Sequence, residues 1–253
     1  MAPPLLEERP QEGLAVASPA PARIYGIDTL RGICVVLMAV FHFSYDLYFY
    51  CGFPPGVIAN PFMTFAQVAS SGGFILLSGF SSRLSRSNLK RGARVLVCGA
   101  LVCAVTWLWG DFIRFGILQF LGCAMVLYGL THRFWENLPR WPSLFFYIIL
   151  FMLTRRLIPV VLDIPYLYPF GIVSPDFRSS DYFPLFPWFF LFLLGSWLAQ
   201  FRDLLPQAFR ELRVRVLSWL GRHSLAVYLI HQPVLVVISM ALAFLTGHSF
   251  SVG

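Results

Sequence analysis

Long apolar stretches alternate with short polar connections along most of this chain. A helix needs roughly 17 to 25 mostly apolar residues to cross the hydrocarbon core of a bilayer. Seven stretches approach that length, at 31–50, 62–82, 94–110, 114–131, 143–162, 184–201 and 223–246. The first, second, sixth and seventh have the strongest pattern. We therefore predict an all-α, polytopic integral membrane helix bundle with about seven transmembrane helices.

The two ends of the chain lack this pattern. Residues 1–22 are rich in Pro, Ala and Glu, and they have no basic start followed by a long apolar core, so they do not resemble a cleaved signal peptide. We expect a disordered tail at 1–22, a transmembrane domain at 23–248 and a short C-terminal tail at 249–253.

Basic residues predict the orientation, because Lys and Arg stay on the cytoplasmic side of short loops. The connection at 51–61 has no Lys or Arg, whereas three alternate connections are rich in them. This asymmetry places the N-terminus in the cytoplasm and the C-terminus outside. The basic residues of those three connections are Arg83, Arg86, Lys90, Arg91, Arg94, Arg133, Arg140, Arg202, Arg210, Arg213, Arg215 and Arg222.

Composition supports a membrane protein and removes several other classes. The chain is 58% hydrophobic and 12% charged, about half the charged fraction of a soluble domain. Its net charge of +7 follows from the topology and suits anionic lipid headgroups, so we expect membrane lipids and no nucleic acid as partners. The five cysteines form no CxxC pair, and we expect neither a disulfide framework nor a metal site.

The first span carries three charged or titratable side chains that are costly in lipid. Arg31 and His42 are 11 positions apart, so they lie about 20° apart around a helix and roughly 16 Å apart along it. Asp46 follows His42 by one turn and can hold the imidazole in one tautomer. Asp28 fits an N-cap or a local partner for Arg31. The alternative is that Arg31 snorkels to the headgroups and His42 bonds a neighbouring helix.

Two other spans have notable polar content. The second contains small residues that allow either close helix approach or a backbone that lines a cavity. In the last span, His231 reaches a depth similar to that of His42, so the two histidines can meet. Alternatively, His231 makes a structural hydrogen bond beside a kink at Pro233. The small residues of the second span are Ser70, Ser71, Gly72, Gly73, Ser78 and Gly79.

Several motifs resemble the transmembrane acyltransferase superfamily. The stretch "RGICVVLMAVFH" is similar to the R-x10-H signature of acyltransferase-3 enzymes, and "LSGF" followed by "RGAR" is similar to their SGF and RxxR motifs. The chain more closely resembles bacterial relatives of heparan-alpha-glucosaminide N-acetyltransferase. That likeness rests, in order, on "IDTLRG", "FHFSYDL", "IRFGILQFLG", "DYFPLFPW" and "LGRHSLAVYLIHQP".

The resemblance implies an acyltransferase of the bacterial inner membrane that occupies residues 23–248. It implies acetyl-CoA or another acyl-CoA as donor and a hydroxyl or amine, often of a sugar or glycan, as acceptor. His42 would act as general base, with Asp46 behind it and His231 as the other candidate. The resemblance is also compatible with a homodimer. The residues expected to bind CoA are Arg31, Arg83, Arg91, Arg94 and Ser78, and those expected to bind the acceptor are Arg114, Gln119, Arg155 and Asp181.

Three other classes compete with this interpretation. A transporter would also hold ionisable residues at mid-depth, but it usually has internal repeats and broken helices, of which the sequence has no sign. A haem protein could use His42 and His231 as axial ligands. A purely structural subunit is disfavoured, because His and Asp within lipid are costly.

Overall fold

The structure, a computed structural model, describes residues 23–247 except 109, 111 and 165. These residues fold almost entirely into helices, which confirms the all-α prediction; the predicted tails at 1–22 and 249–253 lie outside the described residues. The α-helices are α1 (Tyr25–Phe49), α2 (Pro61–Arg83), α3 (Asn88–Leu108), α4 (Ile117–Asn137), α5 (Arg140–Leu157), α6 (Leu185–Leu198), α7 (Gln207–Glu211), α8 (Arg215–Arg222) and α9 (Ser224–Thr246). Three 3-10 helices, η1 (Pro55–Val57), η2 (Tyr168–Phe170) and η3 (Ala199–Leu204), and a parallel ladder of β1 (Val160–Val161) with β2 (Ile172–Val173) complete it.

Each of the seven predicted spans overlaps one of the long helices. Six helices in the described residues are long and apolar enough to cross a bilayer: α1, α2, α3, α4, α6 continued by η3, and α9. Helix α5 is not among them, and it carries Arg155 and Arg156 in its last turn. Whether α5 crosses the membrane therefore stays a prediction.

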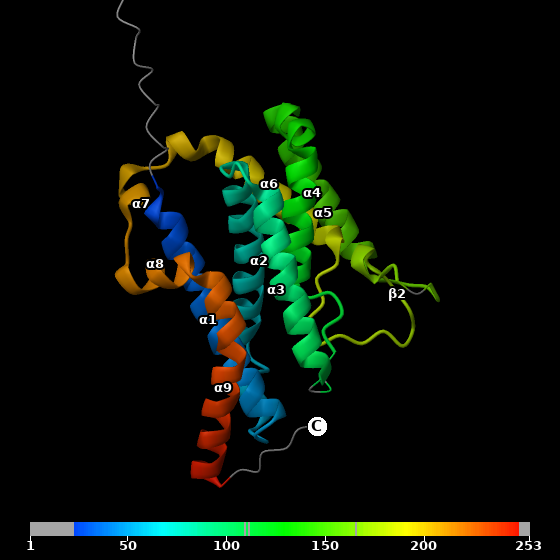
Figure 1. The fold of residues 1–253 in the computed structure, drawn as a ribbon, viewed down its shortest axis with the longest axis vertical. Helices are drawn as coiled ribbons and strands as arrows, with labels where there is room; N and C mark the ends of the chain where they lie inside the picture. The colour runs from blue at the N-terminus through cyan, green and yellow to red at the C-terminus, as the bar shows by residue number, and fades with distance from the viewer. Residues whose placement is uncertain (1–22, 109, 111, 165, 248–253) are drawn as a thin grey trace, which may run out of the picture.

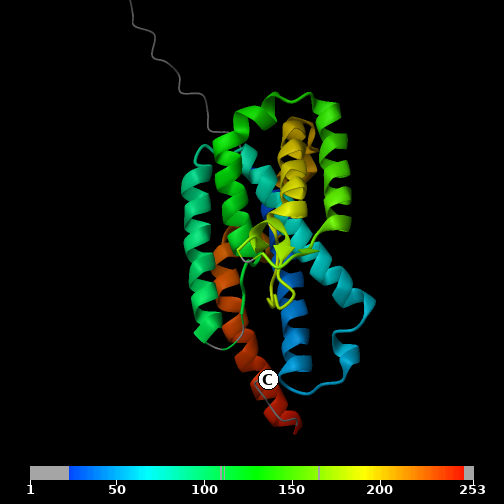
Figure 2. The same ribbon diagram turned by 90° about the vertical axis from the view of Figure 1, so that its right-hand side faces the viewer.

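The helices form two groups joined through α2. In one group, α1 packs against α9 and against the short helix α8, which crosses α1 near its start (Figure 1). In the other, α3 packs on α4, and α5 packs on α6, which lies between α4 and α5 in the turned view (Figure 2). Helix α2 contacts both α1 and α6, and so connects the groups.

Glycine allows the backbones of α2 and α6 to touch. A Cβ at Gly79 would lie 1.8 Å from the carbonyl oxygen of Phe192, and a Cβ at Gly195 would lie 1.9 Å from that of Leu76. Such approach is typical of small residues at membrane helix interfaces. The close packing predicted for the second span is thus confirmed at Gly79.

An aromatic core holds α2, α4, α5 and α6 together. Tyr128, Phe120 and Phe192 are fully buried there. The hydroxyl of Tyr128 accepts a hydrogen bond from Ser196 and donates one to Glu136, so its polar atom is satisfied. This core keeps the α4–α6 group rigid beside the site described below.

The predicted orientation gives a direct test. A reporter that is active only outside the cytoplasm should be active when it is fused after residue 253, because seven crossings from a cytoplasmic start end outside. A matched fusion in the basic connection at 84–87 should be inactive. If the C-terminal fusion reports a cytoplasmic location instead, one crossing must be removed, and α5 is the first candidate because of its two arginines.

Candidate functional site

A cavity of about 910 Å³ lies between the two helix groups. It is lined by α1, α2, α3, α4, α8 and α9, and by Ser180, Asp181 and Phe183 of the α5–α6 connection. Its volume is within the range typical of ligand sites. Arginines line one end, and two histidines lie further along α1 and α9.

His42 of α1 and His231 of α9 meet in this cavity. Their ring centroids are 5.0 Å apart and the rings are edge to face. The Nδ1 atom of His231 is hydrogen bonded to the carbonyl oxygen of Tyr228. Because a carbonyl can only accept, Nδ1 carries the proton, and in the neutral ring Nε2 keeps a lone pair. That Nε2 atom is buried, and it has no hydrogen-bond partner among the described residues.

Asp46 links the same two helices one turn further along α1. Its side chain is fully buried, and its Oδ1 accepts a hydrogen bond of 2.8 Å from Nε2 of Gln232. Within the part of the chain that the structure describes, no hydrogen bond joins Asp46 to His42, although their spacing allows one. The observed bond instead ties the turn after His42 to the residue after His231. Asp46 Oδ2 and Gln232 Oε1 are both buried and unpartnered within the described ranges.

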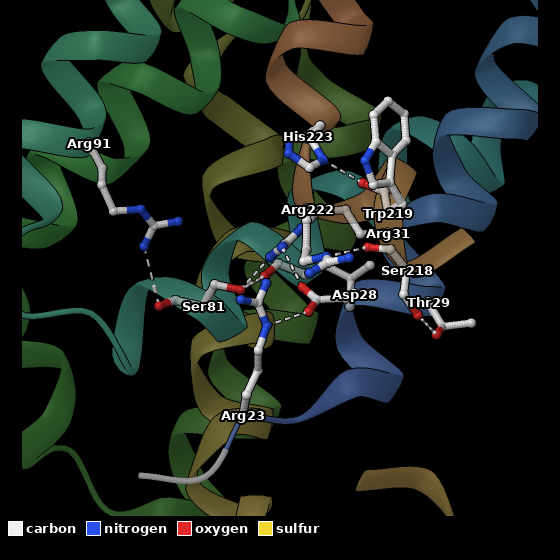
Figure 3. A network of polar contacts seen from close by, with 11 residues as sticks. Arg23, Asp28, Thr29, Arg31, Ser81, Arg91, Ser218, Trp219, Arg222 and His223 are labelled. Atoms are coloured by element: carbon white, nitrogen blue, oxygen red, sulfur yellow. Dashed lines mark hydrogen bonds and ion pairs between the residues drawn. The ribbon is translucent and has the colours of Figure 1, made fainter. Parts of the chain in front are cut away.

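Four arginines line the other end of the cavity. Arg31 comes from α1, Arg91 and Arg94 come from the first turns of α3, and Arg222 ends α8. Arg31 Nη2 donates to Ser81 Oγ at 2.6 Å, and Arg91 Nη1 donates to the Ser81 carbonyl at 3.4 Å. Figure 3 shows these two guanidinium groups converging on Ser81 from opposite sides. The arrangement concentrates positive charge where helices from three parts of the sequence meet.

Asp28 fixes the position of Arg31 within this cluster. The Asp28 carboxylate is 3.7 Å from Arg31 Nη1, and it accepts a hydrogen bond of 2.7 Å from Arg23 Nε (Figure 3). The prediction of a local partner for Arg31 is confirmed. The alternative of an N-cap is wrong, because α1 begins after Ile24 and Asp28 lies within its first turn.

A comparison with protein families assigns the chain to a family. A model of the catalytic domain of heparan-alpha-glucosaminide N-acetyltransferase matches residues 23–233. The chain belongs to this acetyltransferase family. No curated protein and no solved structure matches it. The matched region contains both histidines and all four cavity arginines, so both ends of the cavity have residues within the catalytic domain of a transmembrane N-acetyltransferase.

Two further predicted site residues line the acetyltransferase cavity. Ser78 of α2 does so with Ser70 and Ser71 of the same helix, so the small residues of the second span both pack closely and line the cavity. Asp181 lines it from the connection before α6, where its Oδ2 also accepts a hydrogen bond of 2.9 Å from the backbone N–H of Ile117. This hydrogen bond at the start of α4 partly offsets the cost of burying the carboxylate.

Five predicted site residues are not among those that line the cavity: Asp46, whose contacts are described above, and the four that follow. Gln119 Nε2 donates to the carbonyl of Gly99, and this hydrogen bond joins α4 to α3. The guanidinium groups of Arg114 and Arg155 lie over the rings of Phe177 and Trp188, at 5.6 and 5.7 Å. Arg83 ends α2.

Sequence reasoning did not assign three residues that the structure places in or beside the site. Gln232 was not considered, although its position next to His231 on an intramembrane helix was a usable signal. The charge pattern assigns Arg222 to topology alone, and Ser81 lies within the second predicted span without a predicted role. Each needed the tertiary contacts to be recognised.

The cavity histidines are too close to each other to act together as haem ligands. Two axial ligands stand on opposite faces of the porphyrin with the iron between them. Edge-to-face rings with centroids 5.0 Å apart leave no space for that plane. Among the described residues, no group of three or more His, Cys, Asp or Glu side chains could hold a metal ion.

Asp181 should make stability depend on pH. Burial raises the pKa of this carboxyl to about 6, so the folded protein keeps a proton that the unfolded chain releases near pH 4. Its stabilising effect is complete below about pH 4 and is lost as the pH rises through about 6, by up to roughly 3 kcal/mol. The melting temperature of wild type in detergent should therefore fall relative to that of Asp181→Asn between about pH 4 and 7. Parallel pH curves for the two proteins would contradict this assignment.

Proposed function

We propose that this acetyltransferase moves an acetyl group from acetyl-CoA to a hydroxyl or amine of a sugar acceptor, with His42 as general base. The observation that carries the proposal is the single cavity that holds a cluster of arginines at one end and a pair of histidines further along. The inner membrane of a bacterium is the proposed location. The family supplies the reaction class, and the cavity supports the placement of donor and base.

The arginine end suits the phosphates of CoA. Guanidinium groups bind phosphate oxygens through charge-assisted hydrogen bonds, and Arg31 is already oriented by Asp28 and Ser81. His42 lies 11 residues further along α1, or roughly 16 Å. CoA bound by its phosphates at the arginines would extend its pantetheine arm along α1, which brings the thioester toward the histidines.

The histidine end suits the chemical step. His42 would take the proton from the acceptor hydroxyl or amine as the acceptor atom bonds to the thioester carbonyl carbon. The bond from that carbon to sulfur then breaks, and the CoA thiolate leaves and takes up a proton. His231, whose Nε2 carries a lone pair beside His42, would accept a hydrogen bond from the acceptor or from the His42 ring.

The Asp46–Gln232 hydrogen bond would position the two histidines. It joins α1 and α9 next to both of them, so it limits the separation of the rings. Asp46 therefore acts through Gln232 rather than on His42 alone. Because Asn keeps an oxygen acceptor, Asp46→Asn should cost less turnover than removal of the base itself.

The direct test is transfer of label. Membranes that contain the protein are incubated with acetyl-labelled acetyl-CoA and either a defined amino sugar or a mixture of cell-derived glycans, and labelled product is separated. Label should appear in an acceptor only when the protein is present. Transfer to none of these acceptors, from protein that binds acetyl-CoA, would contradict the acetyltransferase assignment.

The arginine cluster gives a second test of the donor site. Arg91 and Arg94 changed together to Gln should weaken CoA binding by about tenfold or more, since a hydrogen bond to a charged group contributes about 1.5–3 kcal/mol. Binding is measured by calorimetry with purified protein. The matched control changes Arg86 and Arg133, two basic residues that do not line the cavity, and should leave the affinity unchanged. Equal affinity in the cavity double variant would assign Arg91 and Arg94 to topology alone.

A further inference from the structure

One wall of the cavity is open to the bilayer. Most apolar lining residues of α4 are buried, including Leu118, Leu121 and Met125. Several of those on α3 and α9 line the same cavity and yet are exposed. The most exposed are Leu101 at 61%, Val105 at 49%, Val237 at 65% and Met240 at 43%.

This opening lies beyond the histidines, on the side away from the arginines. Val237 and Met240 follow His231 on α9 by 6 and 9 residues, or about 9 and 14 Å. Leu101 and Val105 follow Arg94 by 7 and 11 residues on α3, again roughly 10 to 16 Å. Toward these ends α9 diverges from α3 (Figure 1), as it also does in the turned view (Figure 2).

The wall opposite is polar. Gln67, Ser70 and Ser71 line the cavity from the N-terminal half of α2, which runs antiparallel to α1 and so lies at the same level as the opening. This part of the cavity thus offers hydrogen-bonding groups on one side and an apolar gap to lipid on the other. Its shape and polarity suit an amphiphile with a polar head at α2 and an aliphatic chain between α3 and α9.

We propose that the acceptor is a lipid-anchored sugar, whose headgroup reaches the histidines while its chain passes between α3 and α9 into the bilayer. This inference rests on the proposed function and names its acceptor class. The donor does not require the opening, because an acetyl group has no long chain and CoA is held at the other end. The gap between Leu101 and Val237 is therefore the entry route of the acceptor.

The test uses two acceptors with the same headgroup, methyl glucosaminide and dodecyl glucosaminide, with the full chain in lipid nanodiscs and labelled acetyl-CoA. Each methylene buried in an apolar site contributes roughly a fourfold gain in binding. The dodecyl compound should therefore have a KM at least tenfold lower than that of the methyl compound. Equal KM values would overturn the proposal.

Variants that fill the gap make the test specific. Leu101→Trp and Val237→Trp should remove the advantage of the dodecyl compound, so that its KM rises to that of the methyl compound. Val97→Trp and Ile238→Trp are matched controls, because both positions are exposed on the same helices and do not line the cavity; they should behave as wild type. The proposed route would be contradicted if the gap variants lost turnover with both acceptors, or if they kept wild-type turnover with both.

Two further measurements separate this proposal from failure of the proposed function. A dodecyl glucosaminide with a photoreactive group on its chain should cross-link to α3 and α9, even in protein that transfers no acetyl group. Cross-linking elsewhere, or none, would overturn the proposal. Dodecanoyl-CoA is also tested as donor. If it reacts faster than acetyl-CoA, and if the gap variants lose this higher rate, the gap holds the donor chain and the proposal is wrong.

Discussion

His42→Ala should lower turnover by about 10² to 10⁴-fold while the protein stays folded and still binds acetyl-CoA. Removal of a general base typically costs this much, because the acceptor must then lose its proton without a positioned partner. CoA affinity should persist because the arginines that would hold the phosphates lie roughly 16 Å away along α1. The measurement is single-turnover transfer of labelled acetyl, with CoA binding measured on the same preparation.

The matched control for this variant is His132→Ala. His132 is exposed near the end of α4 and does not line the cavity, so its removal should leave both turnover and affinity unchanged. Normal transfer by folded His42→Ala protein would make His42 structural. His231 would then become the leading base, because its Nε2 carries a lone pair in the neutral ring and the residue lines the same cavity.

Gly221→Val should prevent α8 from packing on α1. A Cβ at Gly221 would lie 1.9 Å from the carbonyl oxygen of Asp28, and one at Gly32 would lie 2.0 Å from that of Leu217. Both contacts are with backbone, so no side chain can rotate to relieve them. We expect the free energy of unfolding to fall by an amount at or above the upper end of the 1–3 kcal/mol usual for overpacking. The measurement is a large fall in melting temperature in detergent.

The same substitution should also weaken acetyl-CoA binding. Asp28 orients Arg31, and Arg222 follows Gly221 directly, so displacement of α8 would disturb the arginine end of the cavity. Gly56→Val is the matched control, because nothing lies within 4 Å of a Cβ built there. A melting temperature for Gly221→Val equal to that of the control would contradict the close packing of α8 on α1.

The membrane helices and the shared face of Arg31 and His42 could be predicted from sequence, because both depend on local properties. Hydrophobicity over a window of about 20 residues decides whether a segment enters lipid. The period of the α-helix then decides which residues share a face. The predicted meeting of His42 with His231 also proved correct, since it needed only equal depths on two parallel helices that lie in contact. The segment at 143–162 is harder to assign as a membrane span from sequence, because Arg155 and Arg156 interrupt its apolar pattern.

The partners of individual polar side chains could not be read from the sequence. The spacing of His42 and Asp46 permits a contact, yet Asp46 bonds to Gln232, which lies 186 positions away. Arg83 and Arg91 flank the same connection, but only Arg91 lines the cavity. Gln119 joins α4 to α3 because the two helices approach closely at Gly99.

The sequence by itself therefore determined an all-α membrane bundle, its family and the helix that carries Arg31 and His42. Only the tertiary structure decided which arginines gather around Ser81, which group binds Asp46 and where the cavity opens between α3 and α9. The physical reason is the range of the interactions. Burial in lipid and helical periodicity act on neighbouring residues, whereas these contacts depend on how separate helices cross, and small residues such as Gly79 and Gly221 set those crossings.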